Sequence, residues 1–324
     1  MTRAAALLAA VVLATSACGV EARVGQVTQP IVGGKEAADD RAVVAVERPG
    51  EVFCSGALVG EHAVLTARHC VAPLVQASST GGVVCGITRF GPAVDPASLR
   101  VSGAPDVRGS AADWRGVERV LVPEDNLVCG HDLALVVLSE RLEVAPLEML
   151  LDGGVDAGDG YSALGYGAID TAGSDYGVRR RRDGLEVECL GGECASASVE
   201  PGEWLGPAGP CGGDSGGPAL DADGRVVGVV SRALAGCQAI VYESPAVEAK
   251  WLESALVAAA LPSEDDGCAV APEASTSRPL RSLVVAVAAA ALVIRRNSRV
   301  RRSDRSLGRR YLRSSDRKNS RSGP

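Results

Sequence analysis

The sequence predicts an all-β domain that is closed by a C-terminal helix, and three observations support this. Without the two ends, about 230 of the 324 residues remain, which suits one domain. Aromatic residues make up only 3% of the chain, so the core must consist mainly of Val, Leu, Ala and Ile, and Val-rich runs such as 42–46 and 225–230 are typical of strands. Residues 244–260 are Ala-rich and have an apolar stripe, which predicts an amphipathic helix. The stripe consists of Val247, Trp251, Leu252 and Leu256.

The stretch 213–217, Gly-Asp-Ser-Gly-Gly, carries most of the functional information. It places Ser215 between glycines and directly after an acid. A nucleophilic serine needs this setting, with room for a substrate and free N–H groups near it. Alone the string could equally form a turn. Earlier segments supply His69 within Leu-Thr-Ala-Arg-His-Cys, and Asp132 at the start of an apolar run. The order His, Asp, Ser is one of the known orders of a serine-protease triad.

From about Ile31 to Ala260, the sequence resembles the chymotrypsin-like (trypsin-fold) serine endopeptidases. The resemblance implies two packed six-stranded antiparallel Greek-key β-barrels, formed by residues 31–140 and 155–243. The active site would lie between the barrels, and the C-terminal helix would pack on the second one. Besides the triad segments, the matching stretches are Ile31-Val32-Gly33-Gly34, Cys54-Ser55-Gly56, Gly165-Tyr166-Gly167, Val241-Tyr242 and Trp251-Leu252.

Each residue of the predicted triad has a chemical role. Ser215 would attack the substrate carbonyl while His69, which titrates near neutral pH, accepts its proton and returns it to the leaving amine. Asp132 would fix the imidazole tautomer and offset the imidazolium charge. The backbone N–H groups of Gly213 and Ser215 would form the oxyanion hole. We expect no catalytic role for His131, although it is adjacent to Asp132, because neighbouring residues of an extended segment alternate sides.

The resemblance gives Asp214 and Ile31 a role in activation. Cleavage before Ile31 would create a free α-amine that pairs with the buried Asp214 carboxylate and opens the oxyanion loop. The residue before the cut is Pro30, where the family has a basic residue. We therefore expect an unknown activating protease rather than trypsin-like self-activation, or a first cut elsewhere within residues 19–30.

The predicted substrate pocket lacks a carboxylate. Gly209 stands where trypsin-like members have Asp, so a substrate Lys or Arg would find no partner. Ser231 and Ala233 lie in the pocket wall, and Ile240 replaces a glycine on the facing wall. We expect a shallow apolar pocket that prefers Ala, Val or Leu at the P1 position of protein and peptide substrates.

The ends of the chain indicate export. Residues 1–18 have a basic start, an apolar stretch and a small-residue cleavage site, which predicts a signal peptide. A lipidated Cys18 and an ordinary cut near Ala17 remain equally open. Residues 19–30 would be a propeptide and 31–260 the protease domain. In an exported chain the ten cysteines predict a disulfide framework.

The resemblance implies the disulfides Cys54–Cys70 and Cys211–Cys237. Cys85–Cys129 and Cys189–Cys194 are the residual pairings within the domain. Only three His are present and paired C-x-x-C motifs are missing, so the sequence predicts no metal site, and no cofactor is expected.

The C-terminal segment differs in composition from the domain. Residues 261–282 have the composition of a linker. Residues 283–294 are apolar, but twelve residues are fewer than the roughly 17–25 of a membrane span. The Arg-rich tail that follows favours a membrane anchor or a sorting tag over a buried helix, so 283–324 predicts membrane association. Residues 295–324 carry twelve Lys or Arg and two Asp, so the rest of the chain is acidic, which argues against nucleic acid as a partner.

Other segments leave alternatives open. The Arg run 179–182 is expected to be a solvated loop, with an exosite for acidic substrates or a self-cleavage loop as the other options. The Gly- and Pro-rich stretches 91–110 and 201–213 are expected to be surface loops. The alternative function is a catalytically silent protease homologue that acts as an envelope binding or scaffold protein. An esterase is disfavoured, because the glycines around Ser215 do not form a Gly-x-Ser-x-Gly motif.

Overall fold

The computed structural model describes residues 22–23, 34–50, 52–75, 82–109, 112–168, 176–195, 198–210, 212–234 and 237–261. All of them belong to the first of two units into which the chain divides, Met1–Ser263. The predicted signal peptide, Ile31, the linker and the Arg-rich tail lie outside the described residues. Among the residues that are described, no helix is long and apolar enough to cross a membrane.

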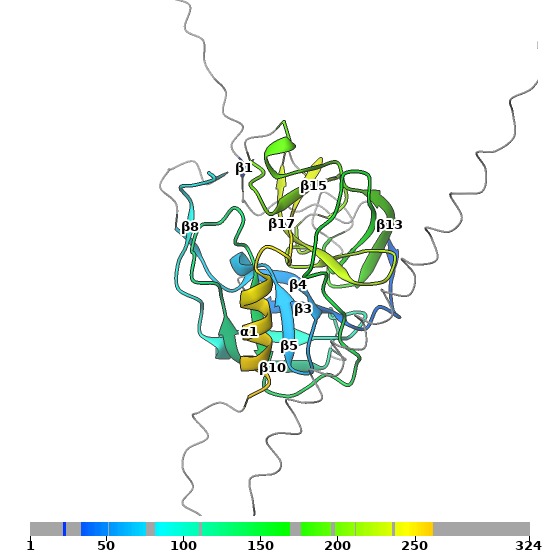
Figure 1. Cartoon of the computed structure of the whole chain (residues 1–324). Coiled ribbons are helices and arrows are strands. Elements are labelled where there is room, and N and C mark those ends of the chain that lie inside the picture. The colour runs from blue at the N-terminus through cyan, green and yellow to red at the C-terminus, as the bar shows by residue number, and fades with distance from the viewer. Residues whose placement is uncertain are drawn as a thin grey trace, which may run out of the picture. The chain divides into compact units, whose positions relative to one another are not determined.

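The all-β fold with a closing helix is confirmed, and its first half is a closed six-stranded barrel (Figure 1). The strands lie in the order β10-β11-β5-β4-β3-β9 and are antiparallel. Three consecutive strands, β3, β4 and β5, pair in sequence, and β9 returns beside β3, which is the Greek-key pattern. The bounds are β3 (Val43–Arg48), β4 (Val52–Leu58), β5 (Ala63–Thr66), β9 (Arg100–Ser102), β10 (Trp114–Leu121) and β11 (Ala134–Leu138).

The second half is an antiparallel sheet in the order β14-β15-β18-β17-β16-β12-β13-β2. Six of its strands correspond to the six expected, and the two-residue strands β14 and β2 extend its two edges. The bounds are β2 (Lys35–Glu36), β12 (Gly160–Gly165), β13 (Arg180–Glu186), β14 (Cys189–Leu190), β15 (Glu203–Pro207), β16 (Pro218–Leu220), β17 (Val226–Leu234) and β18 (Ala239–Glu243).

Short elements complete the described fold. β1 pairs with β7 and β6 with β8, and three 3₁₀ turns lie in connections. Their bounds are β1 (Ala22–Arg23), β6 (Leu74–Val75), β7 (Gly82–Val83), β8 (Arg89–Phe90), η1 (Arg68–Cys70), η2 (Pro96–Ser98) and η3 (Gly191–Glu193).

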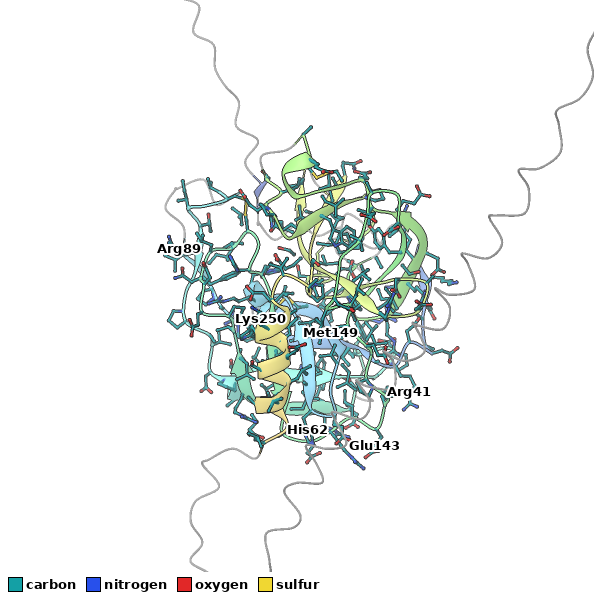
Figure 2. The ribbon with its side chains drawn as sticks, in the orientation of Figure 1. Arg41, His62, Arg89, Glu143, Met149 and Lys250 are labelled. Atoms are coloured by element: carbon teal, nitrogen blue, oxygen red, sulfur yellow. A yellow bond between two sulfur atoms is a disulfide. The ribbon has the colours of Figure 1, made fainter. Side chains whose placement is uncertain are left out.

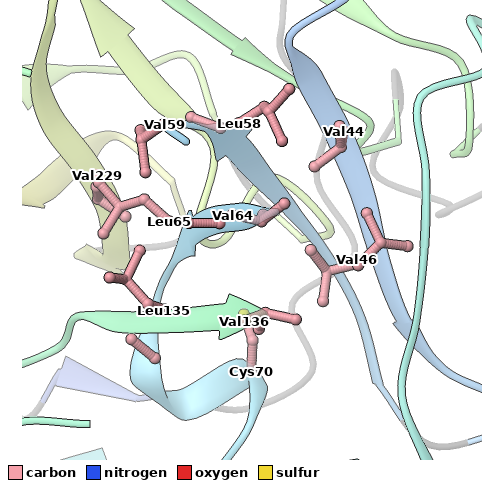
Figure 3. Packing of buried hydrophobic residues seen from close by; sticks show 14 of the residues in the cluster. Val44, Val46, Leu58, Val59, Val64, Leu65, Cys70, Leu135, Val136 and Val229 are labelled. Carbon is pink, nitrogen blue, oxygen red and sulfur yellow. The ribbon is translucent and has the colours of Figure 1, made fainter. Parts of the chain in front are cut away.

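One apolar core joins the two halves. Barrel side chains such as Val64, Leu65 and Leu135 are fully buried and pack with Val229 of β17 (Figure 3). Burial of apolar area is the main favourable term in folding, so this shared core fixes the two halves against each other. The loops that meet at their junction therefore have defined positions.

The helix α1 (Ala249–Ala259) is present, but it packs on the first barrel rather than on the second, so that prediction is wrong. Its buried residues Leu252, Ala255 and Ala259 belong to the core cluster of the first barrel. Arg119 on β10 donates hydrogen bonds to the carbonyls of Ala258 and Leu261, which have no partner inside the helix. The opposite face is solvated and carries Lys250 (Figure 2).

The Arg run is not a solvated loop. Arg180–Arg182 begin β13, and Arg179 and Arg180 are buried. The Arg179 guanidinium donates to the carbonyls of Ala37, Ala38, Val43 and Gly103 and to the Tyr166 hydroxyl. Backbone carbonyls from distant segments thus replace water around this cation.

The stretches expected to be surface loops contain strands. β9 lies within 91–110 and completes the barrel, and β15 lies within 201–213. Glu203 and Trp204 of β15 are buried, because Trp204 packs face to face on Tyr242 of β18 with ring centroids 4.1 Å apart.

Three of the four expected cysteine pairs are bonded: Cys54–Cys70, Cys85–Cys129 and Cys189–Cys194. Cys237 is disulfide-bonded, and its expected partner Cys211 lies outside the described residues.

Candidate active site

Strand pairing brings His69 and Asp132 to the same end of the first barrel. His69 lies on η1, just after β5, and Asp132 lies just before β11. β5 and β11 are antiparallel, with Thr66 opposite Ala134, so the end of one strand meets the start of the other. The adjoining loops must therefore converge.

Asp132 holds His69 at two points. Its Oδ1 accepts the His69 backbone N–H at 2.9 Å, and its Oδ2 lies 2.8 Å from Nδ1 of the ring. Oδ2 also accepts the Ser231 hydroxyl at 2.6 Å, and the Asp132 side chain is 1% exposed. Because Oδ2 is an acceptor for Nδ1–H, the other ring nitrogen, Nε2, is left as the base.

The environment makes His69 a stronger base. Burial acts to lower the pKa of His69, but the charge and the hydrogen bond of Asp132 outweigh it, and the pKa is raised overall. The charge of Arg232 opposes this rise in the pKa. The histidine is thus held beside a permanent anion, as a general base requires.

Ser215 lies in the loop before β16, and its backbone is tied to the first barrel. Its carbonyl accepts the Ser55 N–H at 2.7 Å, and the sulfur of Cys70, the neighbour of His69, lies 3.8 Å from the same oxygen. The side chain is partly exposed. Within the described part of the chain, its hydroxyl makes no hydrogen bond, so the structure joins His69 to Asp132 but not Ser215 to His69.

The loop that carries Ser215 leaves backbone donors available. Among the described residues, the N–H groups of Gly213 and Ser215 have no hydrogen-bond partner. Gly213 has φ +91°, and a Cβ there would lie 3.0 Å from Gly167 Cα, so this position requires glycine. Two donors without partners beside a serine can bind an oxyanion.

Ser55 of β4 fixes this loop, and the sequence did not identify that role. Its hydroxyl donates to the Gly213 carbonyl at 2.9 Å and accepts the Tyr166 N–H at 2.9 Å. Its own carbonyl accepts the Thr66 hydroxyl at 2.8 Å. One fully buried serine thus connects the barrel, the Gly-Tyr-Gly segment and the loop of Ser215.

The Asp214 carboxylate is buried and faces the Gly-Tyr-Gly segment. Its Oδ1 accepts the Gly167 N–H at 2.8 Å. A Cβ on Gly165 or on Gly167 would lie 2.3 Å from an Asp214 carboxylate oxygen, so glycine at both positions makes room for it. Ile31, the expected partner of Asp214, lies outside the described residues.

The four expected pocket residues are spread over β15, β17 and β18. Ala233 lies opposite Ile240 across the β17–β18 pair, and Ile240 is fully buried. Gly209 follows β15, and its nearest side-chain atom is Nη1 of Arg182, 3.7 Å from the position of a Cβ. Ser231 instead directs its hydroxyl to Asp132. A cation, not a carboxylate, therefore lies beside Gly209.

Two further groups near the site belong elsewhere. Cys54, His69 and Cys70 have ligand atoms within 4.8 Å of one another, but the two sulfurs form a disulfide and are not thiolate ligands. His131 Nδ1 lies 2.8 Å from Glu248 Oε1, at the start of α1, so this histidine serves the helix connection.

The chain is similar to known proteins over most of its length. The family model described as Trypsin matches residues 31–251. A mutant of human heparin binding protein has 22% identity and a TM-score of 0.53, with 70% of this chain and 97% of that chain covered. Human heparin binding protein itself has 21% identity and a TM-score of 0.53, with 69% and 96% covered. These structural likenesses agree with the fold described above.

Proposed function

Because the chain belongs to the trypsin family, we propose that it is an exported serine endopeptidase that works through Ser215, His69 and Asp132. The observation that carries the proposal is the pair of hydrogen bonds between His69 and Asp132. The three disulfides agree with an oxidising, exported environment.

The proposed reaction starts with attack of Ser215 Oγ on the substrate carbonyl. His69 Nε2 accepts the hydroxyl proton as the bond forms, and Asp132 stabilises the resulting imidazolium. The negative oxygen then binds to the N–H groups of Gly213 and Ser215. His69 returns the proton to the leaving amine, and water hydrolyses the acyl-enzyme by the same route.

Activation is part of the proposal. An unknown protease would cut before Ile31, and the new α-amine would pair with Asp214, whose carboxylate is already directed inward. Membrane attachment through residues 283–324, or through a lipidated Cys18, is proposed from the sequence alone.

For specificity we propose cleavage after small or medium aliphatic residues. Gly209 offers no carboxylate, Ile240 and Ala233 carry side chains into the pocket walls, and the Arg182 cation beside Gly209 repels a basic side chain.

The test of the function is hydrolysis of a fluorogenic peptide panel by the chain that begins at Ile31. Ala, Val, Leu, Arg, Lys and Glu would be varied at P1, and Ser215→Ala is the control. We expect hydrolysis that Ser215→Ala abolishes, with the highest kcat/KM after Ala, Val or Leu. Equal activity of Ser215→Ala, or no hydrolysis of any peptide, would contradict the endopeptidase. Fastest cleavage after Arg, Lys or Glu would contradict only the aliphatic preference.

A further inference from the structure

A cluster of buried charged residues lies behind Asp132, where neither the sequence nor the reaction requires one. Glu203 of β15 lies directly opposite Glu243 of β18, and both are essentially inaccessible to solvent. Two like charges in opposite positions of a sheet destabilise it. Arg232 of β17, which stands where the family has Trp, is also buried and supplies one compensating charge.

Arg232 and Glu203 form a bidentate ion pair. Nη1 of Arg232 lies 2.6 Å from Oε1 of Glu203, and Nη2 lies 2.7 Å from Oε2. Nη2 also donates to the Ser198 carbonyl. The side chains are 1% and 0% exposed, so the pair has no water around it and its geometry is fixed by protein groups alone.

This ion pair and Glu243 reach Asp132 at three points. Glu203 Oε1 accepts the N–H of Gly130 at 2.9 Å, two residues before Asp132. Glu243 Oε2 accepts the Asp132 N–H at 3.4 Å. The third point is Ser231, whose hydroxyl donates to Asp132 Oδ2 and lies 3.4 Å from Arg232 Nη1. Backbone and side chain of Asp132 are therefore both held by the cluster.

The ion pair is also oriented electrically. Its positive end, Arg232, lies next to Ser231 and so faces Asp132, while Glu203 lies behind it. The charge of Arg232 acts to lower the pKa of His69. Burial, followed by the charges of Glu203 and Asp132, raises the pKa of Glu243 well above its ordinary value, so this acid is neutral at neutral pH.

Other charged groups face the same region. Arg68 on η1 interacts with Asp132, Asp125 and Glu248, and His131 bridges Glu248 and Asp125. None of these contacts the Arg232–Glu203 pair, so the pair can be altered on its own.

We propose that Arg232 and Glu203 are positioning residues of the active site, which orient Asp132 against His69 and oppose protonation of the imidazole. The inference rests on the proposed function, but it concerns a property of His69 that can be measured without substrate.

The test is the pKa of the His69 imidazole, followed by NMR in the chain that begins at Ile31, together with the pH profile of kcat/KM. In Arg232→Met/Glu203→Met, apolar side chains replace the whole pair, a change that buried ion pairs often tolerate. In Glu203→Gln/Glu243→Gln, the Arg232 charge stays without a carboxylate that could compensate it. The control is Arg115→Met/Asp113→Met, which removes an exposed bidentate pair.

The two variants should shift the His69 pKa in opposite directions. Loss of the pair removes the positive charge that faces Asp132, so the pKa and the acidic limb of the profile should rise by about half a unit. Loss of the two carboxylates should lower both by a similar amount, and the control should leave them unchanged.

Shifts in the same direction, or no shift in either variant, would overturn the proposal. A shift in the imidazole pKa without hydrolysis by the wild type would leave the inference standing and would contradict the proposed function instead.

Discussion

At the scale of single residues, local chemistry determines the candidate site. Asp132 is held by His69, Ser231 and Glu243, and each contact uses a different atom of the aspartate. Such a residue has no freedom to choose another partner, so the imidazole tautomer is fixed before substrate arrives. The cost is a group of buried acids whose protonation must follow the fold.

Glu243 should make stability depend on pH in a defined direction. Its pKa is raised by burial, so between its ordinary pKa and the raised one the folded protein keeps a proton that the unfolded chain has released. Stability contributed by this proton is lost as the pH rises through that window. Gln has no proton to lose, so Glu243→Gln should exceed the wild type in Tm by about 3 °C at pH 8 and match it at pH 4.

Differential scanning calorimetry at both values of pH measures this difference. Glu253→Gln, an exposed acid on α1, is the matched control and should give the same Tm difference at pH 4 and pH 8. A larger Tm gain of Glu243→Gln at pH 4 than at pH 8 would show that the proton is not held as described.

At the scale of elements, β4 matters beyond its place in the barrel. Its residue Ser55 ties together the loop of Ser215, the segment that faces Asp214, and Thr66 at the end of β5. The strand thus transmits the rigidity of the barrel to a loop whose glycines would otherwise leave it free.

Ser55→Ala should impair catalysis more than substrate binding. It leaves the Gly213 carbonyl and the Tyr166 N–H without a partner, and the oxyanion donors would shift. We expect kcat to fall about tenfold or more, with little change in KM, because a misplacement of the donors affects the transition state most. Steady-state kinetics on the best peptide measures both parameters.

The control for Ser55→Ala is Ser139→Ala, which removes an exposed hydroxyl bonded to the Gly116 carbonyl. It should leave kcat unchanged. A rise in KM with an unaltered kcat for Ser55→Ala would place the role of Ser55 in substrate binding instead.

At the scale of the whole molecule, what the sequence predicted follows from how local each signal is. His69, Asp132 and Ser215 lie in short motifs, so the motifs and their order located them. The spacing of Leu252 predicts a helix, but periodicity does not say which barrel it covers. Arg179 and Glu203 were missed because their partners lie in distant segments, such as Ala37, Gly103 and Arg232, that come together only in the folded chain.

The N-terminus should control the activity of the molecule as a whole. A chain that begins at Ile31 can place its α-amine on Asp214, whereas one extra residue before Ile31 cannot. We expect the extended chain to have a kcat/KM at least about 100-fold lower, since a buried Asp214 without its cation does not hold the oxyanion loop. Equal activity of the two chains, measured on the same peptide, would contradict the role of Asp214 in activation.

The central claim is that Ser215 is a nucleophile activated by His69, and covalent labelling tests it most directly. The chain that begins at Ile31 would be treated with a fluorophosphonate, and the adduct would be located by peptide mass spectrometry. The account predicts a single adduct on Ser215, abolished in Ser215→Ala and formed far more slowly in His69→Ala. An adduct elsewhere, or labelling of Ser215 at the same rate without His69, would contradict it.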